Sequence, residues 1–132
     1  ATGAYKVFEP LKGQQCLNLT PSPDRKKVAF EVMGGNMYVM NADGTGLVDL
    51  GKGYRPQWAP DSEYLVFMIT QDDGHKLLAS DLYVIRRDGR EKTQLTATSD
   101  KIEMNPSWSA GGKTIAFDVM LEGAIYVLEI SK

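Results

Sequence analysis

The sequence predicts an all-β protein built from three copies of one antiparallel unit, and three observations support this prediction. The segment "MYVMNADGTG" at residues 37–46 returns as "LYVIRRDGRE" at residues 82–91 and, shortened, as "IYVLEISK" at residues 125–132. Each copy follows runs rich in Val, Ile, Phe and Tyr, which half-buried strands prefer. The first two copies contain Asp-Gly at residues 43–44 and 88–89, and Asp-Gly between apolar runs is a strong hairpin signal.

The first two strands of each unit can be superposed along the sequence. The three segments are "TPSPDRKKVAFEV" from Thr20, "QWAPDSEYLVFMI" from Gln57 and "SWSAGGKTIAFDV" from Ser107. The Pro-Asp pairs of the first two segments and the Ala-Gly-Gly of the third predict a tight turn in each segment. Proline fixes φ, aspartate bonds its own backbone, and glycine accepts positive φ. Each segment therefore predicts a strand, a tight turn and a second strand.

The third strand of each unit is the repeated aromatic segment, and a short fourth strand follows in the first two units. "NMYVMN", "DLYVIR" and "AIYVLE" are the third strands, and the fourth strands end at "VDL" and "TQL". The third unit stops after its third strand, at residues 125–130. We therefore expect three four-stranded meanders, the last one incomplete, within a single domain over residues 1–132. Their approximate bounds are 18–50, 55–95 and 105–130.

The repeat length identifies the architecture. Tyr38, Tyr83 and Tyr126 are 45 and 43 residues apart. The second unit carries an insertion, roughly residues 70–80, which we expect to enlarge its middle loop. A repeat of about 40–45 residues with four strands per unit is typical of a β-propeller blade.

These segments resemble one known family. "PSWSAGGKTIAF", "PQWAPDSEYLVF" and "MYVMNADGTG" are similar to the TolB-type (WD-like) β-propeller repeat, and the resemblance covers residues 18–130. Pro21 departs from the pattern, since it stands where Trp58 and Trp108 stand in the other units, and the third unit has neither Pro-Asp nor Asp-Gly. The resemblance implies a non-enzymatic binding or scaffold role, a periplasmic location, and protein partners.

Three blades are too few to close a propeller, because each would have to fill about 120° of the ring. Two copies would supply six blades, and a two-fold dimer is the commonest closed assembly. We therefore expect a homodimer that forms a six-bladed ring, with residues 4–17 pairing with the incomplete third blade of the partner. A fragment of a longer propeller and an open form remain as alternatives.

Composition excludes several classes of function. With 15 Lys and Arg against 17 Asp and Glu, the net charge is −2 and the charges are interspersed, so nothing indicates nucleic-acid binding. The apolar run at residues 65–69 is far shorter than the roughly 20 residues that span a bilayer. Cys16 is alone, which excludes an intrachain disulfide and a cysteine-based metal site.

Blade geometry predicts a binding face. Loops that join successive blades lie on the same face as the middle loop of each blade, and propellers bind partners through such loops. The interpretation of the middle loop stays open, because a solitary histidine is more often solvated and an Asp-Asp-Gly is more often a plain turn than a cation site. We expect no metal site. The expected ligand or partner face comprises Tyr54, Arg55, Asp72, Asp73, His75, Asp100, Lys101 and Glu103.

A second candidate site is the central channel. Arg55 begins an innermost strand, and Asn18 and Asn105 occupy the equivalent positions of the other units. In a two-fold ring these residues would give two arginines and four asparagines. Such a ring would bind a small anion or hold water, and water is the favoured interpretation.

Catalytic motifs are missing from the sequence. There is no Gly-x-Ser-x-Gly, His-Glu-x-x-His or phosphate loop, so we expect no catalytic residue and no cofactor. One alternative is a propeller segment of a prolyl-oligopeptidase-like serine peptidase, which would require an α/β-hydrolase domain downstream. Another is a carbohydrate-binding or lyase-like propeller, for which the sequence offers only Trp and Tyr residues that packing already explains.

Overall fold

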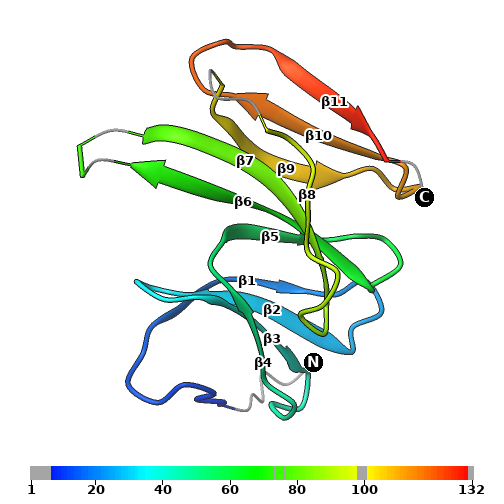
Figure 1. Ribbon diagram of the computed structural model, residues 1–132. Helices are drawn as coiled ribbons and strands as arrows, with labels where there is room; N and C mark the ends of the chain where they lie inside the picture. The colour runs from blue at the N-terminus through cyan, green and yellow to red at the C-terminus, as the bar shows by residue number, and fades with distance from the viewer. Residues whose placement is uncertain (1–6, 73, 76, 98–100, 131–132) are drawn as a thin grey trace, which may run out of the picture.

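Three antiparallel sheets make up the computed structural model, which describes residues 7–72, 74–75, 77–97 and 101–130 (Figure 1). The first sheet contains β1 (Cys16–Pro21), β2 (Lys27–Val32), β3 (Met37–Asn41) and β4 (Val48–Gly51). The second sheet contains β5 (Tyr54–Trp58), β6 (Tyr64–Asp72), β7 (Leu77–Arg86) and β8 (Thr93–Gln94). The third sheet contains β9 (Glu103–Trp108), β10 (Thr114–Val119) and β11 (Ile125–Glu129). No helix occurs in these ranges, so the all-β prediction is confirmed.

Each sheet is a simple meander in which consecutive strands are neighbours. The expected tight turns join the first and second strands of all three sheets. Arg25, Ser62 and Gly112 occupy equivalent positions in these turns and have φ values of 65°, 62° and 73°. This is the left-handed region, which glycine adopts without a steric cost and other residues adopt rarely. Only the third repeat places a glycine there.

The first strand of each sheet contains a bulge at the same repeat position. The pairing of β1 with β2, of β5 with β6 and of β9 with β10 shifts register at Asn18, Arg55 and Asn105 respectively. These three residues have φ values of 54°, 58° and 54°. A bulge with one residue in the left-handed region redirects the local side chains.

The insertion in the second unit lengthens two strands, whereas the sequence predicted an enlarged loop. The ladder between β6 and β7 continues through the pairs Thr70–Ser80, Gln71–Ala79 and Asp72–Leu77. The result is a long hairpin that reaches past the other sheets (Figure 1). The loop prediction was wrong because polar residues on a solvated hairpin still form the backbone ladder.

The apolar core lies between the first and second sheets. Met37 and Val39 of β3 are 0% and 1% exposed, and they belong to one buried cluster with Phe67 and Ile85 of the second sheet. The Trp58 indole nitrogen also donates a hydrogen bond of 2.8 Å to the carbonyl oxygen of Thr20, which joins the two sheets directly. The second sheet also contacts the third, through β5, β6 and β7 against β9.

The residues before β1 lie against the first sheet. Leu11 packs on a buried cluster formed by Phe30, Val32 and Met40. Residues 4–6 of the segment expected to pair with a partner lie outside the described residues, and residues 7–15 form no strand. The pairing of this segment with a partner's third sheet stays a prediction.

Candidate binding face

The predicted face corresponds to one end of the three sheets, which we call the connection end. It carries the β4–β5 and β8–β9 connections and the β6–β7 hairpin tip (Figure 1). The opposite end, which we call the turn end, carries the tight turns between the first two strands of each sheet. This placement follows from the meander, since alternate connections lie at opposite ends of a sheet.

The connection end displays some of the predicted residues. Tyr54 is 37% exposed and Arg55 is exposed at the start of β5. His75 is exposed at the tip of the β6–β7 hairpin, and Asp72 is the last residue of β6. Asp73 and Asp100 lie outside the described residues.

Lys101 forms hydrogen bonds with Glu122 and Tyr126, which were not among the predicted site residues. Its ammonium group donates a 2.8 Å hydrogen bond to the Glu122 carboxylate, and the Tyr126 hydroxyl donates to the same carboxylate. The hydrogen bond from Lys101 and that from Tyr126 lower the pKa of Glu122, and the Glu122 carboxylate raises the pKa of Lys101. The side chain therefore ties the β8–β9 connection to the β10–β11 loop.

Glu103 is buried, with 2% of its surface exposed, and so is not displayed on the face as the sequence predicted. Its carbonyl oxygen accepts a hydrogen bond from the Ser80 hydroxyl. Ser80 also forms a parallel bridge with Ile102. These contacts fix the base of the β6–β7 hairpin to the third sheet. The sequence does not reveal this role of Glu103, because the role depends on a contact between the second and third units.

The predicted channel residues Asn18, Arg55 and Asn105 form hydrogen bonds at the bulges of the first strands. The side-chain nitrogen of Asn18 donates to Glu31 over 2.6 Å, and the backbone N–H of Arg55 donates to the same carboxylate oxygen over 3.0 Å. Asn105 donates to Asp118 over 3.3 Å in the third sheet. Glu31 and Asp118 occupy equivalent repeat positions, and that recurrence is the signal that could have identified them.

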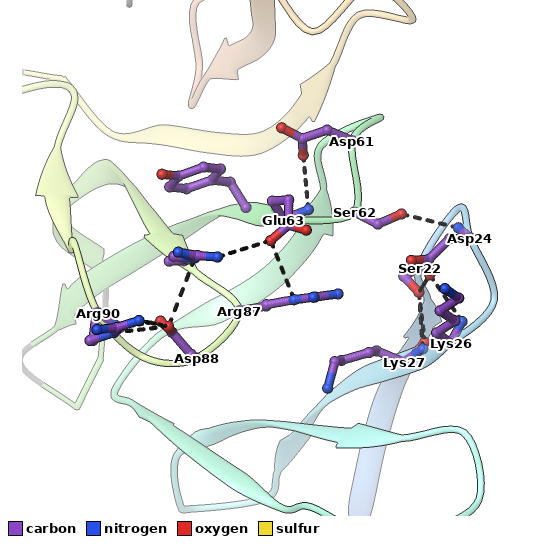
Figure 2. A network of polar contacts seen from close by, with 12 residues as sticks. Ser22, Asp24, Lys26, Lys27, Asp61, Ser62, Glu63, Arg87, Asp88 and Arg90 are labelled. Carbon is purple, nitrogen blue, oxygen red and sulfur yellow. Dashed lines mark hydrogen bonds and ion pairs between the residues drawn. The ribbon is translucent and has the colours of Figure 1, made fainter.

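The turn end holds a polar network that joins the sheets (Figure 2). The Asp24 backbone N–H donates to the Ser62 hydroxyl over 3.0 Å, so the tight turns of the first two sheets touch. Glu63 pairs with Arg86 and Arg87 over 3.3 and 3.4 Å. These bonds are structural, since each links neighbouring turns or strands.

A cleft of about 760 Å³ opens at the turn end between the second and third sheets. Tyr64, Glu91 and Trp108 are among its lining residues. Among the described residues, the buried Trp108 indole nitrogen has no hydrogen-bond partner, whereas the equivalent Trp58 nitrogen bonds to the preceding sheet. The second and third sheets are therefore less tightly joined at this end than the first and second.

No protein-family model matches the sequence, but several solved structures resemble the chain. TolB from Agrobacterium tumefaciens is 22% identical with a TM-score of 0.66, and the match covers 85% of this chain and 41% of TolB. The β-propeller domain of the trilobed protease from Pyrococcus furiosus is 10% identical with a TM-score of 0.65, and 88% of this chain covers 39% of that domain. The chain has a β-propeller fold.

Prolyl oligopeptidase B from Galerina marginata is a further match, at 15% identity and a TM-score of 0.68, with 95% of this chain covering 22% of the enzyme. The chain thus spans less than half the length of each of these proteins. At such identities the likeness shows the propeller fold alone. Among the residues that the structure describes, there is no helix of the length and apolar character needed to cross a membrane.

Proposed function

We propose that this chain is a non-enzymatic β-propeller scaffold that binds a protein or small ligand through its connection end. The observation that carries the proposal is the β6–β7 hairpin, which extends beyond the sheets and has an exposed tip at residues 74–75. Its base is fixed by the contacts of Ser80 with the third sheet. The ladder between β6 and β7 is already formed as far as Asp72 and Leu77, so the binding of a partner to these strands costs little conformational entropy.

Similarity to TolB supports the finer parts of the proposal. The repeat motifs resemble those of the TolB type, and that resemblance implies a periplasmic location and protein partners. We also propose that two copies associate into a six-bladed ring, because the three sheets of the described residues cannot fill a closed propeller.

A second candidate function is the propeller segment of a prolyl-oligopeptidase-like serine peptidase. The likeness to prolyl oligopeptidase B favours it, since its TM-score of 0.68 is as high as that of TolB at 0.66. In that case the parent gene would encode an α/β-hydrolase domain with a Gly-x-Ser-x-Gly motif beside this segment. Sequencing the gene around these codons separates the two candidates.

The proposed binding face is tested by shortening the hairpin. Replacing residues 72–78 with Asn-Gly keeps the Gln71–Ala79 pair and closes it with a two-residue turn. Both proteins are immobilised and incubated with a periplasmic extract, and the retained proteins are quantified by mass spectrometry. We expect at least one protein to bind the unaltered chain and to be lost from the shortened one.

A matched control keeps the hairpin length and changes a loop at the same end. Replacing Gly34-Gly35 in the β2–β3 loop with Asn-Gly leaves β6 and β7 untouched, so its set of retained proteins should equal that of the unaltered chain. Identical sets for all three proteins would contradict the proposed binding face.

A further inference from the structure

We propose that the open faces of the third and first sheets are the two halves of one interface, which a second copy of this chain joins head to tail. This inference rests on the two-copy ring proposed above and names the residues that would close it. The two sheets lie at opposite ends of the stack (Figure 1).

The third sheet exposes a face that is buried in the first sheet and, except for the half-buried Val84, in the second sheet. Ile125 and Val127 of β11 are 81% and 64% exposed. Met37 and Val39 occupy the equivalent positions of the first sheet and are 0% and 1% exposed, because the second sheet covers them. Leu82, equivalent to Ile125 in the second sheet, is also 0% exposed. The β11 face therefore has the composition of an intersheet contact but no sheet upon it.

The first sheet exposes the other half of the proposed interface. Leu19 of β1 is 61% exposed. The equivalent residues in β5 and β9 are Pro56 and Pro106, which are among the fully buried side chains. Both strands lie against a preceding sheet, whereas β1 has none before it. Leu19 therefore occupies a position that is buried in each sheet with a preceding neighbour.

A polar contact fixes the expected register. In the first sheet, Glu31 lies opposite Met37 and accepts the backbone N–H of Arg55 from the next sheet over 3.0 Å. In the third sheet, Asp118 lies opposite Ile125 and is exposed. The residue of a second copy that is equivalent to Arg55 is Asn18, which has the same left-handed conformation at the same bulge. The Asp118 carboxylate is therefore positioned for the backbone N–H of Asn18 in the second copy.

The segment before β1 fits this arrangement. Residues 7–15 precede β1 as β4 precedes β5, so they correspond in chain order to a fourth strand of a preceding sheet. Leu11 packs near Met40, and Leu50 of β4 shares a core cluster with the equivalent Ile85. Within the described residues the third sheet has three strands, and residues 7–15 of a second copy would lie beside β11, at the position of a fourth strand.

The interface is tested by placing one charge on each half. Solution mass is measured by sedimentation equilibrium for the unaltered chain, for Val127→Lys and for Leu19→Asp, both of which change side chains exposed in a single copy. We expect twice 14.6 kDa for the unaltered chain and 14.6 kDa for each variant. Mixing the variants should restore the dimer, because one of the two interfaces in the mixed ring is unaltered. Leu121→Lys is the matched control, since this loop residue is 96% exposed but lies outside both halves, and it should remain dimeric.

The proposed hydrogen bond between Asp118 and the Asn18 amide is tested separately. Asp118→Ala should raise the dimer dissociation constant by about tenfold and remove the slow hydrogen exchange of the Asn18 amide in the dimer. A dimeric unaltered chain whose variants also stay dimeric would overturn this interface but leave a dimer through another surface. A monomeric unaltered chain would overturn the two-copy ring itself, and the hairpin experiment would still decide the binding face.

Discussion

The Glu31 carboxylate, only 6% exposed, connects two sheets through one oxygen atom. That oxygen accepts Asn18 from its own sheet and the Arg55 backbone from the next one. A buried charge is tolerated only when hydrogen bonds replace its hydration, and both donors are supplied by residues at repeat-equivalent bulges. The repeat sequence thus encodes a polar contact between sheets as well as their apolar core.

Glu31→Ala should lower the free energy of unfolding by about 2 kcal/mol, because it leaves the Arg55 N–H and the Asn18 amide without their acceptor. Urea denaturation measures the change. Glu129→Ala removes an exposed carboxylate from β11 and should change stability by less than about 0.5 kcal/mol. Equal stability of the unaltered chain and Glu31→Ala would contradict the role assigned to this carboxylate.

Replacing Arg25 with glycine should increase the stability of the fold. The residue is exposed with φ of 65°, and the third repeat already has Gly112 at this position. Relief of the left-handed strain should outweigh the greater entropy of an unfolded glycine, so Arg25→Gly should stabilise the fold by about 0.5–1 kcal/mol in urea denaturation. Lys26→Gly changes the next residue, whose φ is not positive, and should destabilise or leave stability unchanged. A loss of stability in Arg25→Gly would contradict this account.

At the scale of elements, local rules predicted the strands and turns, but they did not predict the length of the β6–β7 hairpin or the contacts between units. Pro-Asp and Gly-Gly give the tight turns, and the spacing of Tyr38, Tyr83 and Tyr126 reflects stacked Phe–Tyr pairs in all three sheets. The lengthening of β6 and β7 was missed because residues 70–76 are polar or glycine and show no apolar alternation that would mark a strand. The burial of Glu103 was missed because it arises from contact between β9 and the second sheet.

The first tight turn should make stability depend on acid pH. Hydrogen bonds from Ser22 and the Lys26 backbone lower the pKa of Asp24 from its ordinary 3.8. A lowered pKa contributes stability above the unfolded value, and this contribution is lost as pH falls through the folded pKa. The urea midpoint should therefore decrease below about pH 4, and it should decrease less in Asp24→Asn. Glu129→Gln, which removes an exposed carboxylate, is the control and should follow the unaltered chain.

At the scale of the whole molecule, the sequence predicted a stack of propeller units. The exposed faces of the first and third sheets, at the two ends of this stack, indicate what can associate with it. Ile125, Val127 and Leu19 are exposed, whereas the equivalent internal residues are buried, apart from the half-buried Val84 of the second sheet. The sequence alone could not show this contrast for Ile125 and Val127, because both positions are apolar in every repeat and their exposure depends on the neighbouring sheet. Large exposed apolar faces indicate association with another surface.

Cys16 offers a direct measure of how the first sheet is covered, since it is the sole cysteine of the chain and packs against the same buried cluster as Leu11. Its reaction rate with an aromatic disulfide reagent should rise in Leu11→Ala, because truncation of Leu11 opens the cluster over Phe30 and Met40. Leu19→Ala alters an exposed residue of the same strand and should leave the rate of the isolated chain nearly unchanged. If a second copy docks on this sheet, the rate should also fall as protein concentration passes through the dimer transition. A rate that is independent of both Leu11 and concentration would mean that neither residues 7–15 nor a second copy covers the first sheet.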